Sequence, residues 1–226
     1  MEAGTISSGA VAAAEVVEDR LTAAACRALD VVGATLLIIL LAPLIVVVAI
    51  AVRLDSPGGA IFRQRRVGRH LEPFTVHKFR SMYASAGHDL HRAYVTGLIT
   101  AQAEHAHEGL YKLKRDDRVT PVGRLLRRTS IDELPQLWNV VRGEMSLVGP
   151  RPSIPYEVEK YPEPWLVRFS VKPGITGLWQ VSGRSQLTWE QMIALDLEYV
   201  NKRSFWFNVR ILLKTVPVVL LGRGAA

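Results

Sequence analysis

The sequence predicts a predominantly helical α+β protein that is attached to a membrane. An uncharged apolar run, VVGATLLIILLAPLIVVVAIAV, occupies residues 31–52, and helix-like patterns occupy residues 188–201 and 205–222. A small β element is predicted at residues 60–82, after the apolar run and before the two helix-like patterns. At a rise of ~1.5 Å per residue, the apolar run is as long as the ~30 Å hydrocarbon core of a bilayer. We therefore expect it to enter the membrane.

The composition indicates a folded chain with an anionic partner. A chain of 226 residues is long enough for one sizeable domain or two small ones. Its net charge of +7 favours nucleic acid, a membrane surface or phosphorylated substrates as partners. The single cysteine, Cys26, excludes an internal disulfide framework, and its position beside the apolar run favours packing over reactivity.

The apolar run contains one proline, Pro43, directly after Ala42. A proline inside a helix removes a backbone hydrogen bond and favours a kink. Two arrangements stay open: a kinked helix that spans the membrane, or two helical arms that return to the same face. Taken alone, the length of the run favours spanning. The flank after the run is expected on the cytoplasmic side because it is rich in arginine: Arg53, Arg63, Arg65, Arg66 and Arg69.

The other elements follow from local patterns. Residues 1–23 predict a mobile tail, and two short strands are predicted on either side of a turn at Gly68–Pro73. Residues 87–115 predict a polar helical insertion, in which His88 and His91 are more typical of a solvated helix face than of a metal site. Residues 188–201 form an amphipathic pattern that opens with a capping box. The cations and aromatic residues within 205–222 favour a helix lying in the membrane interface.

Two adjacent carboxylates, Asp132 and Glu133, lie in the stretch RRTSIDELPQLWNVVRGEMSLVGPRP. One interpretation is structural: Ser130 and Glu133 fit a capping box, or Asp132 is itself the helix cap. The other interpretation is chemical. Both can hold, because a carboxylate at a helix N-terminus has a lowered pKa and stays ionised, which suits a nucleophile.

Cationic residues near these acids favour the chemical interpretation. Arg127 lies five residues before Asp132, and the prolines on both sides of Arg151 restrict its backbone and so fix a phosphate-binding guanidinium. An acid among arginines needs Mg²⁺ or covalent chemistry to approach a diphosphate. Walker, GxGxxG and HExxH motifs are absent from the sequence, so nucleotide hydrolases and zinc enzymes have no support.

Four ordered blocks resemble the bacterial sugar transferases, the monotopic phosphoglycosyl transferases that act on polyprenyl phosphate. The blocks are IFRQRRVGRHLEPFTVHKFRSM, TPVGRLLRRTSIDELPQLWNVVRGEMSLVGPRP, KPGITGLWQVSGR and LDLEYVNKRS. The resemblance covers residues from about 24 to 220. A lone Asp-Glu pair would be weak evidence, whereas four blocks in order behind an apolar segment are specific.

The resemblance implies transfer of a sugar-1-phosphate from a UDP-sugar to undecaprenyl phosphate, with release of UMP. The insertion at 87–115 resembles members that transfer hexose-1-phosphates. Asp132 matches the family nucleophile, which forms a covalent phosphosugar intermediate and contacts Mg²⁺, and Glu133 matches its partner in proton or metal handling. The remaining matched positions are implied to bind phosphate or substrate: Arg127, Arg151, Lys78, Arg80, Arg184 and Asp196.

The resemblance also replaces the spanning arrangement with a re-entrant one, in which the helix bends at Ala42-Pro43 and returns. Family members often carry serine before this proline, so Ala42 removes a hydroxyl that could bond a freed carbonyl. Asn208 is a second departure, near a position where members often carry an acid.

The expected protein is a single monotopic domain over 1–226, with a re-entrant helix at 24–53, a catalytic region at 54–204 and an interfacial helix at 205–222. Its active site would lie on the cytoplasmic face of the bacterial inner membrane, against the lipids of that membrane. There it would begin exopolysaccharide, capsule or O-antigen synthesis ahead of downstream glycosyltransferases.

Two other hypotheses compete with this one. A membrane-tethered nucleic-acid binder lacks a recognisable reading motif, so nucleic acid is not expected as a partner. A noncatalytic scaffold would tolerate loss of both Asp132 and Glu133.

Overall fold

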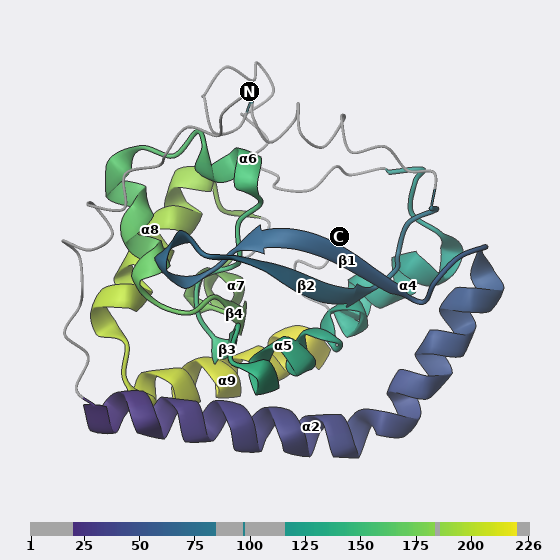
Figure 1. Cartoon of the computed structure of the whole chain (residues 1–226), viewed down its shortest axis with the longest axis horizontal. Coiled ribbons are helices and arrows are strands. Elements are labelled where there is room, and N and C mark those ends of the chain that lie inside the picture. Colours follow the sequence, from purple (N-terminus) through teal and green to yellow (C-terminus); the bar gives the residue numbers. More distant parts are fainter. Residues whose placement is uncertain (1–19, 85–96, 98–115, 184–185, 221–226) are drawn as a thin grey trace.

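The computed structural model describes residues 20–84, 97, 116–183 and 186–220. A long helix, α2 (Arg20–Asp55), forms the base of the molecule, and the other elements lie on one side of it (Figure 1). The described part is mainly helical with two small sheets, which confirms the predicted α+β class. Most of the insertion at 87–115 lies outside the described residues, as do residues 1–19 of the expected tail.

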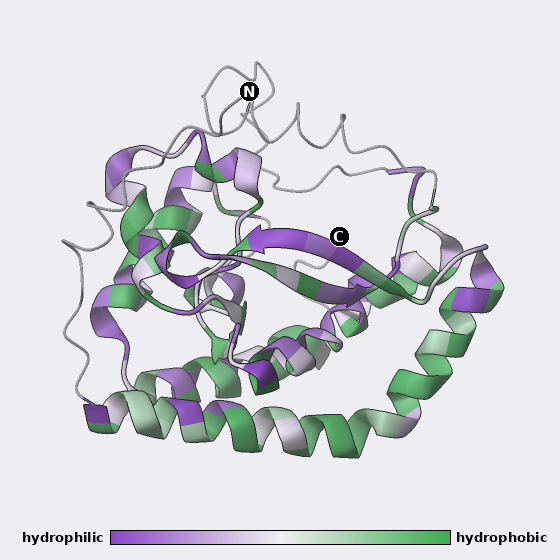
Figure 2. Cartoon of the chain, in the orientation of Figure 1, coloured by the Kyte–Doolittle hydropathy of each residue, from purple (hydrophilic) through white to green (hydrophobic). Residues whose placement is uncertain are grey.

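Helix α2 is the apolar element that the sequence predicts to enter the membrane. It is already helical at Arg20, so the predicted start at 24 is four residues late. By length and composition it could cross a bilayer: its most apolar window has a mean hydropathy of 3.2, and only 11% of that window is buried. Figure 2 shows the hydrophobic colouring that runs along it.

A sharp bend divides α2 into two arms (Figure 1), although the helix is continuous from Arg20 to Asp55. Pro43 lies inside the helix and has no N–H to donate to the carbonyl of Ile39. Proline is the common cause of such a bend. The two arms pack on different clusters: Ala34 of the first lies in the main core, and Val48 of the second packs in a separate cluster with Phe79.

A β-hairpin follows α2 and carries one of the candidate site residues. Strands β1 (Ile61–Val67) and β2 (Pro73–Phe79) pair antiparallel, as predicted, with Phe62 opposite Lys78. The short 3-10 turn η1 (Arg69–Leu71) joins them. Lys78 lies near the C-terminal end of β2. This strand contacts the short turn at Ile131–Glu133, which carries the acidic pair.

A second, parallel sheet was not predicted. It joins β3 (Ser146–Val148) to β4 (Gly174–Thr176), and each strand has three residues, too few for a periodic pattern. The strands approach closely at Gly174, where an added Cβ would lie 2.0 Å from the amide nitrogen of Gly149. Because β3 ends at Val148, the sheet fixes the start of the Pro-Arg-Pro segment at 150–152.

The remaining helices surround these sheets. The sequence predicts the starts of two of them correctly: Pro121 opens α4, and Thr188 forms the capping box of α8 with Gln191. In chain order they are α4 (Pro121–Thr129), η3 (Ile131–Glu133), α5 (Gln136–Arg142), α6 (Pro155–Val158), η4 (Glu163–Ser170), α7 (Leu178–Ser182), α8 (Trp189–Lys202) and α9 (Phe205–Leu220).

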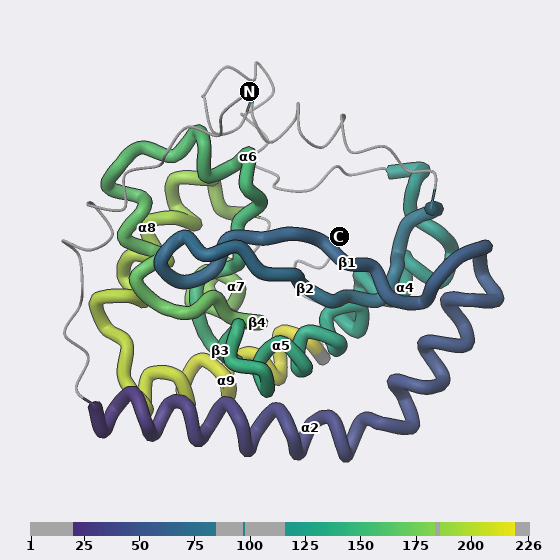
Figure 3. The backbone as a smooth tube through the Cα atoms, viewed as in Figure 1, coloured from purple at the N-terminus to yellow at the C-terminus, as the bar shows by residue number. Residues whose placement is uncertain are grey.

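The first arm of α2 is bonded directly to the elements that carry the site. Its Arg27 donates to the carbonyls of Val140 and Val141 at 2.7 and 2.9 Å, at the C-terminal end of α5. Its Asp30 accepts from the backbone N–H of Leu147 in β3 at 2.8 Å. Figure 3 traces α5 and α9 alongside this arm. Helix α2 therefore holds α5 and β3 in place.

Candidate active site

The two acids lie on η3, a single 3-10 turn between α4 and α5. Ser130 ends α4 in the left-handed conformation, with φ of 58°, and this reverses the chain so that Asp132 and Glu133 face the hairpin. The structural interpretation of these residues is wrong. Ser130 makes no side-chain cap, the N-cap of α5 is Pro135, and Glu133 contacts Lys78 instead.

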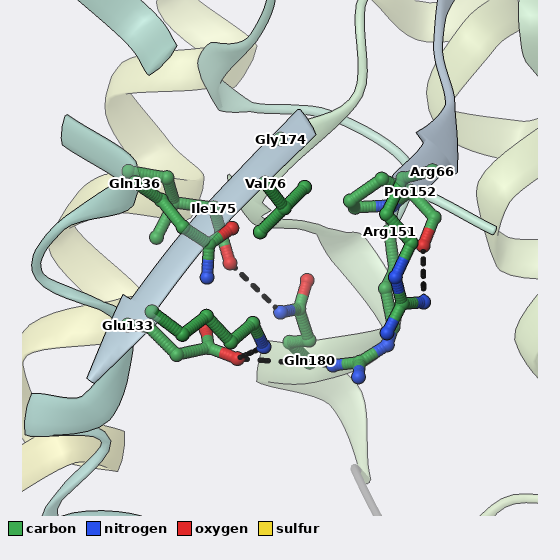
Figure 4. A pocket seen from close by; sticks show the side chains of 10 residues that line it. Arg66, Val76, Glu133, Gln136, Arg151, Pro152, Gly174, Ile175 and Gln180 are labelled. Carbon is green, nitrogen blue, oxygen red and sulfur yellow. Dashed lines mark hydrogen bonds and ion pairs between the residues drawn. The ribbon is translucent and has the colours of Figure 1, made fainter. Parts of the chain in front are cut away.

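Glu133 brings two cations together from distant parts of the chain. Its Oε1 lies 2.7 Å from Nζ of Lys78 in β2 and 3.8 Å from Nη1 of Arg151 in the Pro-Arg-Pro segment (Figure 4). The three side chains are between 18% and 25% exposed, so the cluster is partly shielded from water. Burial lowers the pKa of Lys78, and the charge of Glu133 opposes that shift.

Asp132 lies beside this cluster and beside a third cation. Its negative charge acts on both Lys78 and Arg127, in each case favouring the protonated form. The guanidinium of Arg127 is held in place by a hydrogen bond, in which its Nε donates to Oγ of Ser81 at 3.0 Å, just beyond β2. The structure therefore brings Asp132, Glu133, Lys78, Arg127 and Arg151 together, five residues that the resemblance implied for one site.

A small recess opens next to the ion-pair cluster (Figure 4). Cationic and acidic side chains form part of its wall, and two glutamines complete it. The lining residues are Arg66, Val76, Lys78, Glu133, Gln136, Arg151, Pro152, Gly174, Ile175 and Gln180.

Arg80 lies away from this recess, although the resemblance placed it at the substrate site. It is buried, and its guanidinium donates to four backbone carbonyls, those of Val52, Ser56, Pro57 and Gly59, at 2.6 to 3.2 Å. These carbonyls belong to the last turn of α2 and the turn that follows. Arg80 thus joins the end of α2 to the hairpin, because an arginine fork can satisfy several orphan carbonyls at a helix end.

Asp196 is also held in a structural contact. Its side chain is 1% exposed and its Oδ2 lies 2.5 Å from Nη2 of Arg168. Burial raises its pKa to about 6, with the positive charge of Arg168 opposing the shift. Arg184, the last predicted site residue, lies outside the described residues.

Two arginines that hold the Pro-Arg-Pro segment were missed by sequence reasoning. Arg168 donates to the carbonyl of Arg151 at 3.0 Å, and Arg66 donates to the carbonyl of Pro152 at 2.9 Å. Arg66 lies in an arginine-rich run that we interpreted only as the flank of a membrane segment. The run gave no sign that Arg66 contacts Pro152. Arg168 had no local signal, since its partners lie up to 28 residues away.

The donor set of the site suits a magnesium ion only in part. Across the described ranges there is no group of three or more His, Cys, Asp or Glu side chains placed to hold a metal. Mg²⁺ in enzymes is commonly bound by one or two carboxylates together with substrate phosphates. Asp132 is the carboxylate to which the resemblance gives that role, and the neighbouring Glu133 contacts Lys78 and Arg151.

Comparison with known proteins decides the family. The model of one family, described as bacterial sugar transferase, matches residues 21–222. This chain belongs to the bacterial sugar transferase family. The four blocks that resemble the family, and the five residues brought together here, all lie inside the matched region.

Relatives within the family carry names of transferases in glycan synthesis. A UDP-galactose-lipid carrier transferase of Erwinia amylovora is 46% identical over 199 residues, 88% of this chain but 41% of that relative. A UDP-glucose:undecaprenyl-phosphate glucose-1-phosphate transferase of Caulobacter vibrioides is 44% identical, over 86% of this chain and 69% of the relative. An exopolysaccharide production protein, ExoY, of Rhizobium meliloti is 37% identical, over 88% of this chain and 87% of the relative. The chain thus spans about two fifths of the first of these relatives and most of the last.

Proposed function

We propose that this protein transfers a hexose-1-phosphate from a UDP-hexose to undecaprenyl phosphate and releases UMP. One observation carries the proposal: Lys78 and Arg151 both form ion pairs with Glu133, the residue that follows Asp132 in the sequence. A site with two acids and three cations suits a reaction between a diphosphate and a phosphate. Two relatives bear names that specify galactose or glucose transfer to a lipid carrier.

The reaction proceeds in two displacements at phosphorus. A carboxylate oxygen of Asp132 attacks the phosphorus that carries the hexose, and an O–P bond forms as the bond to the bridging oxygen breaks. The electron pair of that bond leaves on UMP. An oxygen of undecaprenyl phosphate then attacks the same phosphorus, the bond to Asp132 breaks, and the free carboxylate returns with undecaprenyl-diphosphate-hexose as product. A covalent intermediate lets a soluble donor and a lipid acceptor use one site in turn.

The cations stabilise the charge that the two displacements concentrate on the phosphate oxygens. Lys78 and Arg151 are held at one edge of the site by Glu133, and Arg127 is held at the other by Ser81. Cations fixed before the substrate arrives need no reorganisation during the reaction. Glu133 also takes the proton when the acceptor phosphate enters as a monoanion.

Asp132 would hold Mg²⁺ jointly with the phosphates of the donor. A bound Mg²⁺ would neutralise the diphosphate charge that otherwise repels the approaching carboxylate. The chain itself supplies the nucleophile, the cations and their orientation.

The membrane arrangement follows from where the apolar surface lies. Both arms of α2 expose large apolar side chains, and α9 exposes Trp206, Leu213 and Val216. The catalytic elements lie on one side of α2 (Figure 1), so a helix that re-enters places the site against the headgroups of a single leaflet. The arginine-rich hairpin that follows α2 supports the cytoplasmic side for that leaflet, because positively charged flanks tend to stay there. The lipid-linked product would pass to glycosyltransferases of exopolysaccharide or capsule synthesis.

Release of UMP tests the proposal. Purified protein in detergent micelles is incubated with Mg²⁺, undecaprenyl phosphate and a panel of UDP-hexoses. We expect UMP release with at least one donor, lost in Asp132→Asn and kept in Glu198→Gln, a matched change at an exposed acid. Absence of UMP with every UDP-sugar would overturn the proposed function.

A further inference from the structure

Two glutamines in the recess have no role in the reaction described so far. Gln136 opens α5, and Gln180 lies in α7. Both line the recess that Lys78, Glu133 and Arg151 also line (Figure 4). In that view the carboxamide of Gln180 lies between Glu133 and Arg151, close to the ion-pair cluster.

Gln136 presents an unused donor. Its side chain is 2% exposed, and its Nε2 has no hydrogen-bond partner anywhere in the described part of the chain. Leaving a buried amide donor unsatisfied costs about 1–3 kcal/mol, so such groups in native proteins call for an explanation. A ligand that brings an oxygen to this atom would supply the missing partner.

Gln180 presents an unused acceptor. Its Nε2 donates to the carbonyl of Ile175 at 2.9 Å, and this bond fixes which end of the carboxamide is the oxygen. The Oε1 is buried and receives no hydrogen bond from any described residue. An added Cβ at Gly177 would lie 2.9 Å from this oxygen, so glycine at that position avoids a close contact with it.

One donor and one acceptor in a recess of about 10 Å³ define the ligand group by its chemistry. That volume holds a single oxygen-sized group. A hydroxyl satisfies both amides, because it accepts from Gln136 and donates to Gln180. An ionised phosphate oxygen only accepts, which leaves Gln180 unpaired.

We propose that Gln136 and Gln180 bind one hydroxyl group of the sugar-nucleotide donor and so set its specificity. The inference rests on the proposed function for the identity of the donor. The hydroxyl belongs either to the hexose or to the ribose of the uridine. A site built to hydrogen-bond a hydroxyl rejects analogues that lack it far more strongly than an apolar site does.

The test compares Gln136→Met and Gln180→Met, two changes of similar volume that each remove one polar partner. The matched control is Gln186→Met, at an exposed glutamine. Each variant is assayed for UMP release with UDP-hexose, with a series of singly deoxygenated hexose donors, and with the 2′-deoxyuridine donor. Binding of the same donors is measured separately, with each change placed in Asp132→Asn, so that affinity is read without turnover.

We expect each recess variant to lower kcat/KM for the parent donor about 10- to 100-fold, mainly through KM. The loss should disappear for the one donor that lacks the bound hydroxyl, and that donor identifies hexose or ribose as its source. An equal loss with every donor, or no loss, overturns the inference. The two amides would then bind only water or serve only to stabilise the fold. Absence of UMP release by the unaltered protein would instead reject the proposed function, and donor binding would still test the glutamines.

Discussion

The ammonium group of Lys78 and the carboxylate of Glu133 lie 2.7 Å apart although 55 residues separate them in the sequence. This contact ties the hairpin to the turn that carries Asp132. Burial lowers the pKa of Lys78, so the pair lies in surroundings that disfavour an unpaired charge. The contact is therefore both a structural link and the means of holding a cation at the proposed reaction centre.

Lys78 and Glu133 should act as one unit in catalysis. We expect Lys78→Met and Glu133→Gln each to lower kcat/KM by about 10²-fold or more, because each leaves its partner displaced or uncompensated. The double variant should lose much less than the sum of the two free-energy changes, with a coupling of about 1–3 kcal/mol. The exposed pair Lys202–Glu198, at the similar distance of 2.8 Å, is the control and should show almost none. Additive losses at Lys78 and Glu133 would contradict a functional pair.

Arg80 should stabilise the protein without binding substrate. Its four bonds to the end of α2 are lost in Arg80→Met. We expect the free energy of unfolding in detergent micelles to fall by about 2–4 kcal/mol, since buried carbonyls lose a charged donor. The KM for UDP-hexose should stay within about twofold. A large rise in KM with unchanged stability would instead show that Arg80 binds substrate.

Asp196 predicts a specific pH dependence of stability. Burial raises its pKa to about 6 in the folded protein, above its ordinary value of 3.8. The folded state therefore binds this proton more tightly, so the stabilisation is present below about pH 4 and is lost as pH rises through 6. Relative to Asp196→Asn, the free energy of unfolding of the unaltered protein should fall by up to about 3 kcal/mol over that interval. A difference that is flat, or that grows with pH, would contradict the assignment.

The bend of α2 predicts that both of its ends are reached from the same side of the membrane. Single cysteines are placed at the exposed positions Leu21 and Glu72, in a chain whose only native cysteine, Cys26, is replaced by alanine. We expect an impermeant thiol reagent to label neither site in intact spheroplasts and both sites after lysis. Labelling of Leu21→Cys in intact spheroplasts would show that the helix spans.

The elements that the sequence predicted well are those with a local cause. The strand pattern of the hairpin, the proline that opens α4 and the capping box at Thr188 all act over a few residues. The proline in the apolar run likewise predicts the bend of α2. The acidic centre was predicted because its residues form motifs in a fixed order.

The features that sequence reasoning missed depend on packing between distant segments. The resemblance implied that Arg80 and Asp196 lie around the substrate site, but it did not predict their partners, which are the end of α2 and Arg168. The parallel pairing of β3 with β4 joins three-residue strands that show no pattern of their own. The capping interpretation of Glu133 failed because a partly buried lysine from the hairpin contacts the same carboxylate.

The central claim is that Asp132 bonds to phosphorus. The purified protein is incubated with Mg²⁺ and a UDP-hexose labelled in the sugar, without lipid acceptor, then quenched, digested and mapped by mass spectrometry. The account predicts one hexose-phosphate adduct on the peptide that contains Asp132, absent in Asp132→Asn and discharged when undecaprenyl phosphate is added before the quench. An adduct on a different residue, or turnover with no adduct at all, would contradict it.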